Sequence, residues 1–565
     1  MMIWVLLAVC LPLLPVLLAL HPVLQRWQWR LLPLVSLPAL GLVLLGPAQW
    51  QLELPGLLLG ANWQLDTLRQ PFLLLTALLW SFAGLYATGY VKQFRRSFAL
   101  FWGLTLCGNL GLVVAADLVS FYAFFALMTF AGYGLVVHER TSAAFRAGKV
   151  YLVMAVLGEM ALLAGLLLAA GAASSLLLAD LPVAIAESPY AGVMMGLLLV
   201  GFGVKAGLPL LHLWLPLAHP VAPTPASAVL SGAMIKAGLL GWLLTLPLGQ
   251  GSYILLGTVL ALFGVLASLG AALIGVCQRQ SKAVLAYSSI SQMGLMTLML
   301  GVALAEPERA VWLLPVIGTF ALHHGLAKGA LFLSVGITVP KHRAARWLYW
   351  GLVALPGLSL AGLPLSSGAH TKLAMKQALQ SDGLVMSLAP WLGGLLSAGA
   401  VATLLLVLRF LWLQSHTVQG HTHKNEIGPC MQLGWGLVLM ASVFVFPWLA
   451  PELPTVIATS LADHVTYFIS LLWPMLLAVL IAGMVVGVRL RAPAVPAGDL
   501  VVPLEVLIKR GMGLPGCYSS FCTECGASFG SRLKWILPLA QWSEPRLRVH
   551  IGSLLLILLL LLLLV

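Results

Sequence analysis

The chain has 565 residues, of which 61% are hydrophobic and only 8% are charged, and its mean hydropathy is +1.01. A soluble protein carries about 25% charged residues, so this composition excludes a soluble globular enzyme and indicates a polytopic membrane protein. The formal net charge of +13 does not indicate nucleic-acid binding, because the basic residues lie mostly in short loops, where they report topology.

Apolar segments recur along the whole chain. Each membrane crossing needs roughly 20 apolar residues, so the sequence predicts an all-α fold of about 14 to 16 transmembrane helices without a soluble catalytic domain. The predicted helices, in chain order, lie at residues 1–20, 31–45, 71–90, 98–114, 118–137 and 150–170, then in two segments that share residues 203–238, and further at 252–276, 283–305, 310–339, 347–364, 389–413, 433–450, 466–488 and 549–565.

Positive charges alternate between successive loops. The loops after odd-numbered helices hold most of them, whereas the loops between offer only Arg69 and Arg309. The positive-inside rule therefore predicts that the odd-numbered loops are cytoplasmic and that the N-terminus lies outside. The basic residues that this rule predicts to be cytoplasmic are Arg26, Arg30, Lys92, Arg95, Arg96, Arg140, Arg146, Lys149, Arg279, Lys282, Lys341, Arg343 and Arg346.

The stretch GVKAGLPLLHLWLPLAHPVAPTPASAVLSGAMIKAG, residues 203–238, carries polar groups inside very hydrophobic sequence. Lys205, His212, His219 and Lys236 would be costly against lipid, so such groups usually face protein or a water-filled path. Five prolines in the same stretch remove backbone donors and break helices. The pattern predicts a broken helix beside a hydrated cavity.

Further ionisable groups lie at membrane depth along the chain. Glu159 has apolar neighbours on both sides, and His324 and Lys328 are spaced i, i+4 on one helical face. Lys372 follows in GLPLSSGAHTKLAMK. A series of lysine, histidine and carboxylate groups at this depth is typical of a proton path, because a moving charge or water can load and unload each group.

Simpler interpretations stay open for several of these residues. Lys372 can extend its ammonium to the interface, as lysines near helix ends often do. His212 and His219 can be interfacial, and Lys282 can anchor a cytoplasmic loop. Lys205, Lys236 and Glu159 fit the simpler interpretation least, because apolar sequence extends on both sides of each.

Neither a metal nor a cofactor is expected. The sequence has no GxGxxG motif and no cysteine quartet for iron–sulfur or zinc ligation. Two weak patterns remain unassigned. One is a single CxxC, Cys522 and Cys525, with Cys517 nearby, and the other is a lone HxH, His421 and His423, with His416 nearby.

At this point the motifs resemble a family. The segments HLWLPLAHP, SGAMIKAG, SKAVLAYSSISQMG, HHGLAKGALFLSVG and GLPLSSGAHTKLAMK are similar to those of the antiporter-like subunits shared by respiratory complex I, hydrogenase-4 and formate hydrogenlyase-type membrane hydrogenases, and Mrp antiporters. The sequences of these motifs resemble those of the hydrogenase-4 component B branch in particular. The resemblance covers residues 98–413.

The resemblance implies 14 core helices with two inverted five-helix repeats, each containing one broken helix. It places the family's gating lysine on Lys205, its central lysine on Lys236, its relay pair on His324 and Lys328, and its second broken-helix residue on Lys372. The expected division is N-terminal helices at 1–97, repeats at 98–246 and 247–413, C-terminal helices at 414–488, an amphipathic segment at 489–548 and a terminal helix at 549–565.

One departure from the family pattern concerns the carboxylate that pairs with the gating lysine. The family usually has a glutamate on its fifth helix, but the matching position here is Ala126. Glu159 matches an acid that some members carry on the sixth helix. We expect either that Glu159 replaces the usual partner of Lys205 or that the coupling is altered.

The resemblance implies a non-redox, proton-translocating subunit of a complex I-like or hydrogenase-4-like assembly in a prokaryotic inner membrane, without a catalytic site for redox chemistry. Its partners would be other membrane subunits, lipid and protons or Na⁺, but not nucleic acid. Three alternatives stay open: an ion-motive subunit of an inorganic-carbon accumulating complex with a cytoplasmic partner protein, an Mrp-type Na⁺/H⁺ antiporter subunit, and a scaffold with a closed path.

Overall fold

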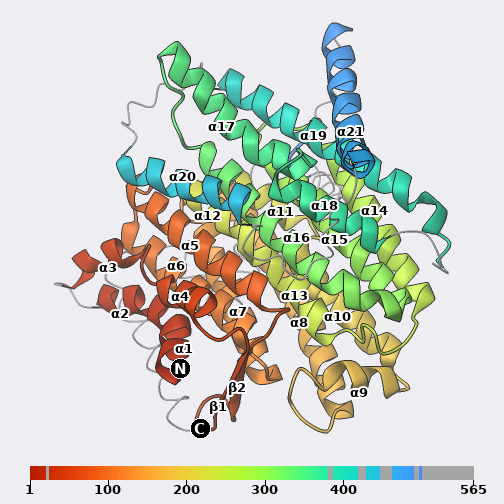
Figure 1. Cartoon of the computed structure of the whole chain (residues 1–565). Coiled ribbons are helices and arrows are strands. Elements are labelled where there is room, and N and C mark those ends of the chain that lie inside the picture. Colours follow the sequence, from red (N-terminus) through yellow and green to blue (C-terminus); the bar gives the residue numbers. More distant parts are fainter. Residues whose placement is uncertain (21–23, 380–385, 418–427, 446–460, 489–494, 499–565) are drawn as a thin grey trace, which may run out of the picture.

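The computed structural model of the chain is a bundle of long helices, many of which run side by side (Figure 1). The described residues are 1–20, 24–379, 386–417, 428–445, 461–488 and 495–498. Within them, 11 helical segments are long and apolar enough to cross a membrane. The expected multi-pass helical fold is therefore confirmed, and the predicted segments 489–548 and 549–565 lie almost wholly outside the described residues.

The helices that form these segments carry the labels of Figure 1. They are α1 and α2 (Met2–Cys10, Leu14–Leu20), α5 (Gln70–Tyr90), α6 (Arg95–Val114), α7 (Leu118–Val136), α8 (Ser142–Ala172), α12 and α13 (Thr224–Val229, Ile235–Thr245), α14 (Ile254–Val276), α15 (Ser281–Ala305), α16 (Pro307–Ser334), α19 (Leu392–Thr417) and α21 (Leu461–Gly487).

Shorter helices complete the described part of the bundle. They are α3 (Gln25–Leu31), α4 (Leu37–Leu45), α9 (Leu181–Glu187), α10 (Ala191–Ala206), α11 (Trp214–Val221), α17 (Arg343–Ala361), α18 (Ser367–Ala378) and α20 (Pro429–Phe444).

The predicted helix at 31–45 is wrong in extent. The chain instead forms α3 and the short helix α4, with a turn at residues 32–36 between them. Pro33 lies in that turn and Pro38 follows in the first turn of α4. Proline removes a backbone donor and is tolerated only at the start of a helix, which explains why one continuous helix does not form.

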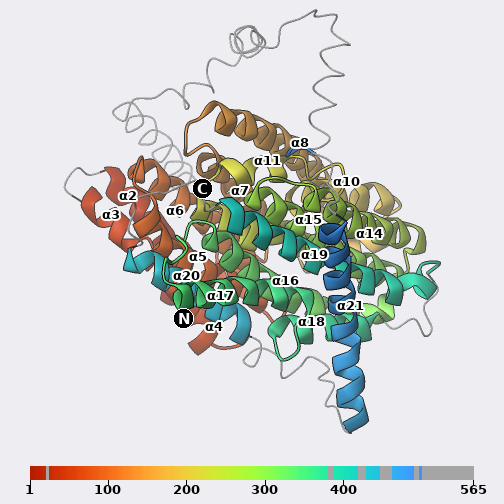
Figure 2. The ribbon, with the colours of Figure 1, turned by 90° about the horizontal axis from the view of Figure 1, so that it is seen from above.

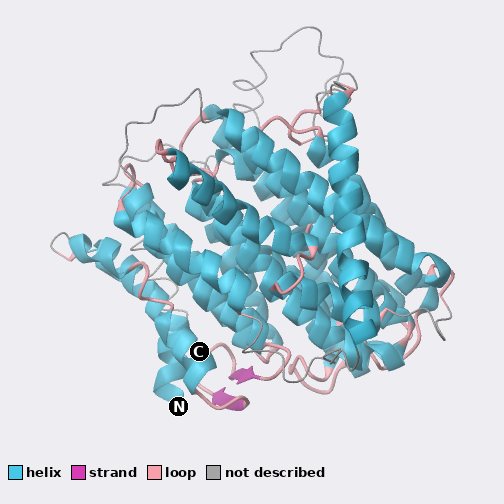
Figure 3. Ribbon diagram, turned by 45° about the horizontal axis from the view of Figure 1, so that its top comes forward, coloured by secondary structure: helices cyan, strands magenta, loops and turns pink. Residues whose placement is uncertain are grey.

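The polar stretch at 49–70, between the predicted helices at 31–45 and 71–90, contains the two strands of the described structure. Strands β1 (Trp50–Leu54) and β2 (Ala61–Leu65) form an antiparallel hairpin at one end of the bundle (Figure 3). The Asn62 amide donates to Asp117 Oδ2 at 2.8 Å, and Asp117 also caps the first turn of α7 by accepting from the Ser120 amide at 2.7 Å. The hairpin is thereby fastened to the end of α7.

Two spans lie at the centre of the bundle with protein on every side. These are α15 and the span formed by α12, a five-residue π-helix (Leu230–Met234) and α13, and their apolar windows are fully buried. By contrast, α21 stands out from the body and is mostly exposed (Figures 1 and 2). The central spans can therefore carry polar side chains that never meet lipid.

Two helices are broken at the same five-residue sequence, AGLPL, at residues 206–210 and 361–365. In both copies the glycine adopts a positive φ, 80° at Gly207 and 102° at Gly362, and so does the last leucine, 70° at Leu210 and 65° at Leu365. Glycine in this conformation ends a helix, and the proline two residues later cannot continue it.

The second half-helices, α11 and α18, follow these breaks. One break falls in each of the two predicted repeats, 98–246 and 247–413, although the limits of the repeats stay a prediction.

Candidate functional site

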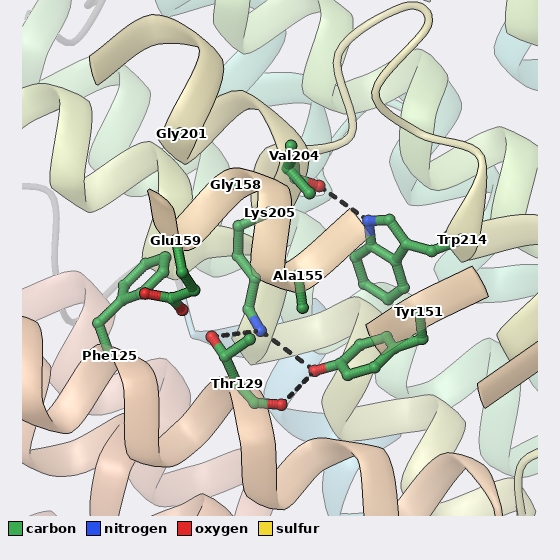
Figure 4. A pocket seen from close by; sticks show the side chains of 10 residues that line it. All are labelled: Phe125, Thr129, Tyr151, Ala155, Gly158, Glu159, Gly201, Val204, Lys205 and Trp214. Carbon is green, nitrogen blue, oxygen red and sulfur yellow. Dashed lines mark hydrogen bonds between the residues drawn. The ribbon is translucent and has the colours of Figure 1, made fainter. Parts of the chain in front are cut away.

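Lys205 lies in the last turn of α10, directly before the first break. Its side chain is buried, and Nζ donates hydrogen bonds to Thr129 Oγ1 at 3.1 Å and to Tyr151 OH at 3.4 Å. Thr129 comes from α7 and Tyr151 from α8 (Figure 4). The predicted gating lysine is thus held between three helices at a point where one of them stops.

Tyr151 ties this lysine to the second half of the broken helix. Its hydroxyl donates to the Thr129 carbonyl at 2.6 Å, and its ring packs edge-on against Trp214 with centroids 5.1 Å apart. Trp214, the first residue of α11, donates from Nε1 to the Val204 carbonyl at 2.8 Å. A side chain after the break therefore satisfies a carbonyl before it, as buried backbone groups require.

Glu159 lies on α8 about two turns after Tyr151, and its side chain is 5% exposed. A cavity of about 20 Å³ is lined by both Glu159 and Lys205, which is room for about one water molecule. Lys205 and Glu159 act on each other electrostatically without forming a direct ion pair. Both carboxylate oxygens lack a hydrogen bond of ordinary geometry within the described chain.

Ala126, where the family pattern has glutamate, is not one of the residues that line this cavity. The neighbouring α7 residues Phe125 and Thr129 line it instead. The acid that faces Lys205 therefore comes from α8 rather than α7 (Figure 4). Sequence reasoning missed Thr129 and Tyr151, although Thr129 follows Ala126 by about one helical turn.

Lys236 follows the π-helix in the central span and is 1% exposed. Its Nζ donates to the Ser231 carbonyl, five residues earlier in the same span, at 2.7 Å. A π-helix widens the turn and loosens the ordinary bonding of the ladder, and such bulges occur frequently at functional sites. The ammonium is thereby satisfied without an acidic partner in contact.

A short chain of hydrogen bonds leads from the span of Lys236 to Lys328. Ser231 Oγ and Ser289 Oγ of α15 lie 2.6 Å apart, and Ser289 Oγ donates to the Leu285 carbonyl at 3.0 Å. Lys328 Nζ of α16 donates to that same carbonyl at 3.1 Å. The two central lysines are thus connected through one face of α15, a link that the sequence did not predict.

The histidines of the sequence pattern are buried. His324 lies on α16 one turn before Lys328, and His219 stacks on Phe332 with ring centroids 4.6 Å apart. Neither imidazole has a hydrogen-bond partner within the described chain. His219 is fully buried and His212 is 7% exposed, so both side chains lie within the protein, while their depth in the membrane stays a prediction.

Lys372 and Lys282 each reach a broken helix. Lys372 Nζ donates to the carbonyl of Ala361, the last residue of α17, at 3.1 Å. Lys282 Nζ donates to the carbonyl of Ala222 at the end of α11, at 2.7 Å. A cation at a helix C-terminus is favourable, so both side chains stabilise helix ends. Whether either one also lies at a membrane interface or anchors a loop stays a prediction.

The described residues contain no group of three His, Cys, Asp or Glu side chains that could hold a metal ion. Cys517, Cys522, Cys525, His421 and His423 lie outside the described residues.

Comparison with known proteins places residues 115–397 in the family described as NADH:quinone oxidoreductase/Mrp antiporter, transmembrane. Hydrogenase-4 component B of Escherichia coli is 27% identical over 431 residues, which are 69% of this chain and 63% of that protein. The chain therefore spans less than two thirds of the length of that relative.

Two solved structures share the fold. A chain of the Mrp complex from Dietzia sp. matches 99% of this chain and 62% of its own length, with a TM-score of 0.66 and 19% identity. A chain of the membrane-bound sulfane sulfur reductase, an archaeal respiratory membrane complex, matches 80% of this chain and 96% of its own length, with a TM-score of 0.64 and 20% identity.

Proposed function

Because this chain belongs to the transmembrane family described as NADH:quinone oxidoreductase/Mrp antiporter, we propose that it translocates protons as a non-redox subunit of a multi-subunit membrane assembly. The relatives and the solved structures belong to such assemblies, namely a hydrogenase, an Mrp complex and a respiratory membrane complex. The partners of this chain would accordingly be other membrane subunits in a prokaryotic inner membrane.

The observation that carries the proposal is the state of the four buried amines. Lys205, Lys236, Lys328 and Lys372 each donate to backbone carbonyls or hydroxyls, and no carboxylate of the described residues lies in ion-pair contact with any of them. A buried ammonium without a contacting anion is costly to keep charged. Small movements of water or of a neighbouring charge therefore suffice to change its protonation, which is what stepwise transfer requires.

Lys205 and Glu159 would form the gate of this path. In the structure the ammonium lies against Thr129 and Tyr151, and both Lys205 and Glu159 line the small cavity. Moving the ammonium across the cavity would replace its hydrogen bonds to two neutral hydroxyls by a charge pair with Glu159. Moving it back would make the charged forms of both Lys205 and Glu159 less favourable. One water in the cavity would carry the proton that each change releases or takes up.

Na⁺/H⁺ exchange is the second candidate function, because the family description includes Mrp antiporters. The same lysines would serve both functions, so an experiment must identify which ions the assembly transports. The native assembly, reconstituted in vesicles with an enclosed pH dye, is given a K⁺ diffusion potential with and without Na⁺. Proton transport predicts uptake that does not depend on Na⁺, whereas uptake that requires an opposing Na⁺ gradient would identify exchange.

A matched pair of variants tests whether the path lies in this chain. Lys205→Ala removes the buried amine, and Lys92→Ala removes an exposed one from a loop. The proposal predicts loss of uptake in the first and wild-type uptake in the second. Wild-type uptake in Lys205→Ala would refute the proposed role of this lysine.

A further inference from the structure

His323 directly precedes His324 on α16 and is 1% exposed. Successive helical residues point about 100° apart, so the two rings face different neighbours. His323 Nδ1 lies 2.8 Å from the hydroxyl of Ser367, the first residue of α18. The imidazole therefore connects the central helix α16 to the half-helix that follows the second break.

The hydrogen-bond pattern determines which ring nitrogen carries the proton. Ser367 Oγ lies 2.6 Å from the carbonyl of Ser442 on α20. A carbonyl only accepts and a hydroxyl has one hydrogen, so Ser367 donates to Ser442 and must accept from His323. Nδ1 of His323 therefore bears hydrogen, and Nε2 of the neutral ring keeps its lone pair.

Nε2 faces the first turn of α18. A Cβ on Gly368 would lie 2.8 Å from this nitrogen and 1.8 Å from the Ser359 carbonyl, so no larger residue fits there. Nε2 is buried and has no hydrogen-bond partner within the described chain. A buried basic nitrogen without a partner is rare and calls for an explanation.

Lys372 lies one turn after Gly368 on the same face of α18. Its side chain runs back over that turn to the Ala361 carbonyl and acts electrostatically on His323. Among the described residues, the other titratable group that interacts with His323 is His324, on its own helix. The lone pair of Nε2 is thus next to the helical turn that the Lys372 side chain covers.

We propose that His323 is a proton-loading residue for the second broken helix, accepting and returning a proton through Nε2 alone. The inference rests on the proposed function. Transfer from the Lys372 ammonium, directly or through one water, breaks an N–H bond there and forms one at Nε2, leaving an amine and an imidazolium. The Nδ1 side is closed, because the hydrogen of Ser367 ends on a carbonyl that cannot pass a proton on.

Two variants separate this role from a structural one. His323→Asn keeps an N–H donor near the position of Nδ1 and removes Nε2, so we expect proton uptake to fall by about tenfold or more with an unchanged unfolding temperature. Ser367→Ala keeps Nε2 and loses the hydrogen bond, so we expect a lower unfolding temperature with most of the uptake retained. A purely structural histidine predicts instead that the two variants behave alike, with uptake falling only as far as the unfolding temperature falls.

Uptake is measured on the native assembly in vesicles, and Lys236→Ala serves as the reference for the proposed function. If Lys236→Ala abolishes uptake and His323→Asn transports at the wild-type rate, the inference about His323 is overturned while the proposed function stands. Equal losses of uptake in His323→Asn and Ser367→Ala, with both variants assembled, would also overturn the inference about His323. So would losses of uptake that follow failed assembly in both of these variants. Wild-type uptake in Lys236→Ala would contradict the proposed function itself.

Discussion

The residues that matter most here are amines held by neutral acceptors. Lys205 contacts two hydroxyls, and Glu159 lines the same small cavity without forming an ion pair with this lysine. Burying two opposite charges costs several kcal/mol each unless geometry and hydrogen bonds compensate. The arrangement therefore fits a pair that forms and separates better than it fits a permanent ion pair.

Glu159→Gln tests this pair at the residue scale. The amide keeps the size of the side chain and removes its charge, so we expect proton uptake to fall by about tenfold or more while the assembly forms normally. Glu187→Gln, on the exposed end of α9, is the matched control and should transport at the wild-type rate. Ala126→Glu, added to Glu159→Gln, should restore part of the uptake by returning an acid to α7.

Wild-type uptake in Glu159→Gln between about pH 6 and 8 would show that this carboxylate only packs between helices. Lys205 would then work without an acid from α8.

At the scale of elements, the two broken helices share more than an interruption. Each break repeats AGLPL with a positive φ at the same two positions, the glycine and the last leucine. In each, a side chain from the second half donates to a carbonyl at the end of the first, Trp214 to Val204 and Lys372 to Ala361. The chemistry differs between the halves, because the first break has its lysine before the glycine and the second has its lysine after it.

Gly207→Ala is the prediction at this scale. Alanine at the positive φ of Gly207 is strained by about 1–2 kcal/mol, although a Cβ would have space, since its nearest neighbour would be 3.7 Å away. We expect a lower unfolding temperature in detergent. Gly192→Ala, in the first turn of the same helix with nothing within 4 Å of a Cβ, should leave that temperature unchanged or raise it. Equal responses of the two variants would argue against a strained break.

Much of this site could be predicted from the sequence, because an ionisable group within a long apolar run is conspicuous. Lys205, Lys236 and Glu159 were found in this way. The hydroxyls of Thr129, Tyr151 and Ser289 could not be found, because serine, threonine and tyrosine are unremarkable in membrane helices. Their importance depends on how distant helices align, which local patterns do not encode. The repeated AGLPL, by contrast, was present in the sequence as a signal of two equivalent breaks.

At the scale of the whole molecule, the described helices form a bundle whose central spans are sheathed by others. The hairpin of β1 and β2 lies at one end, fastened to Asp117. The charge bias predicts that this end lies outside the cell and that the loop at 92–96 is cytoplasmic. Orientation determines the direction of transport, so it needs its own test.

Labelling of introduced cysteines with an impermeant reagent tests the orientation in intact cells. Ala61 in the hairpin is fully buried, so Leu59, which is 72% exposed, is the better external position, and Gln93 is the exposed cytoplasmic one. In a background without native cysteines, we expect Leu59→Cys to be labelled and Gln93→Cys to be labelled only after the membrane is opened. The reverse pattern would invert the topology.

The most direct test of the central claim is proton uptake by Lys236→Ala in the native assembly reconstituted in vesicles. Among the described residues, Lys236 donates to a carbonyl of its own span, so its removal breaks no hydrogen bond to another described helix, and the assembly should form normally. We predict uptake no faster than the passive leak of empty vesicles, with wild-type uptake in Lys92→Ala. Uptake at the wild-type rate in Lys236→Ala would contradict the claim that buried lysines of this chain carry the proton.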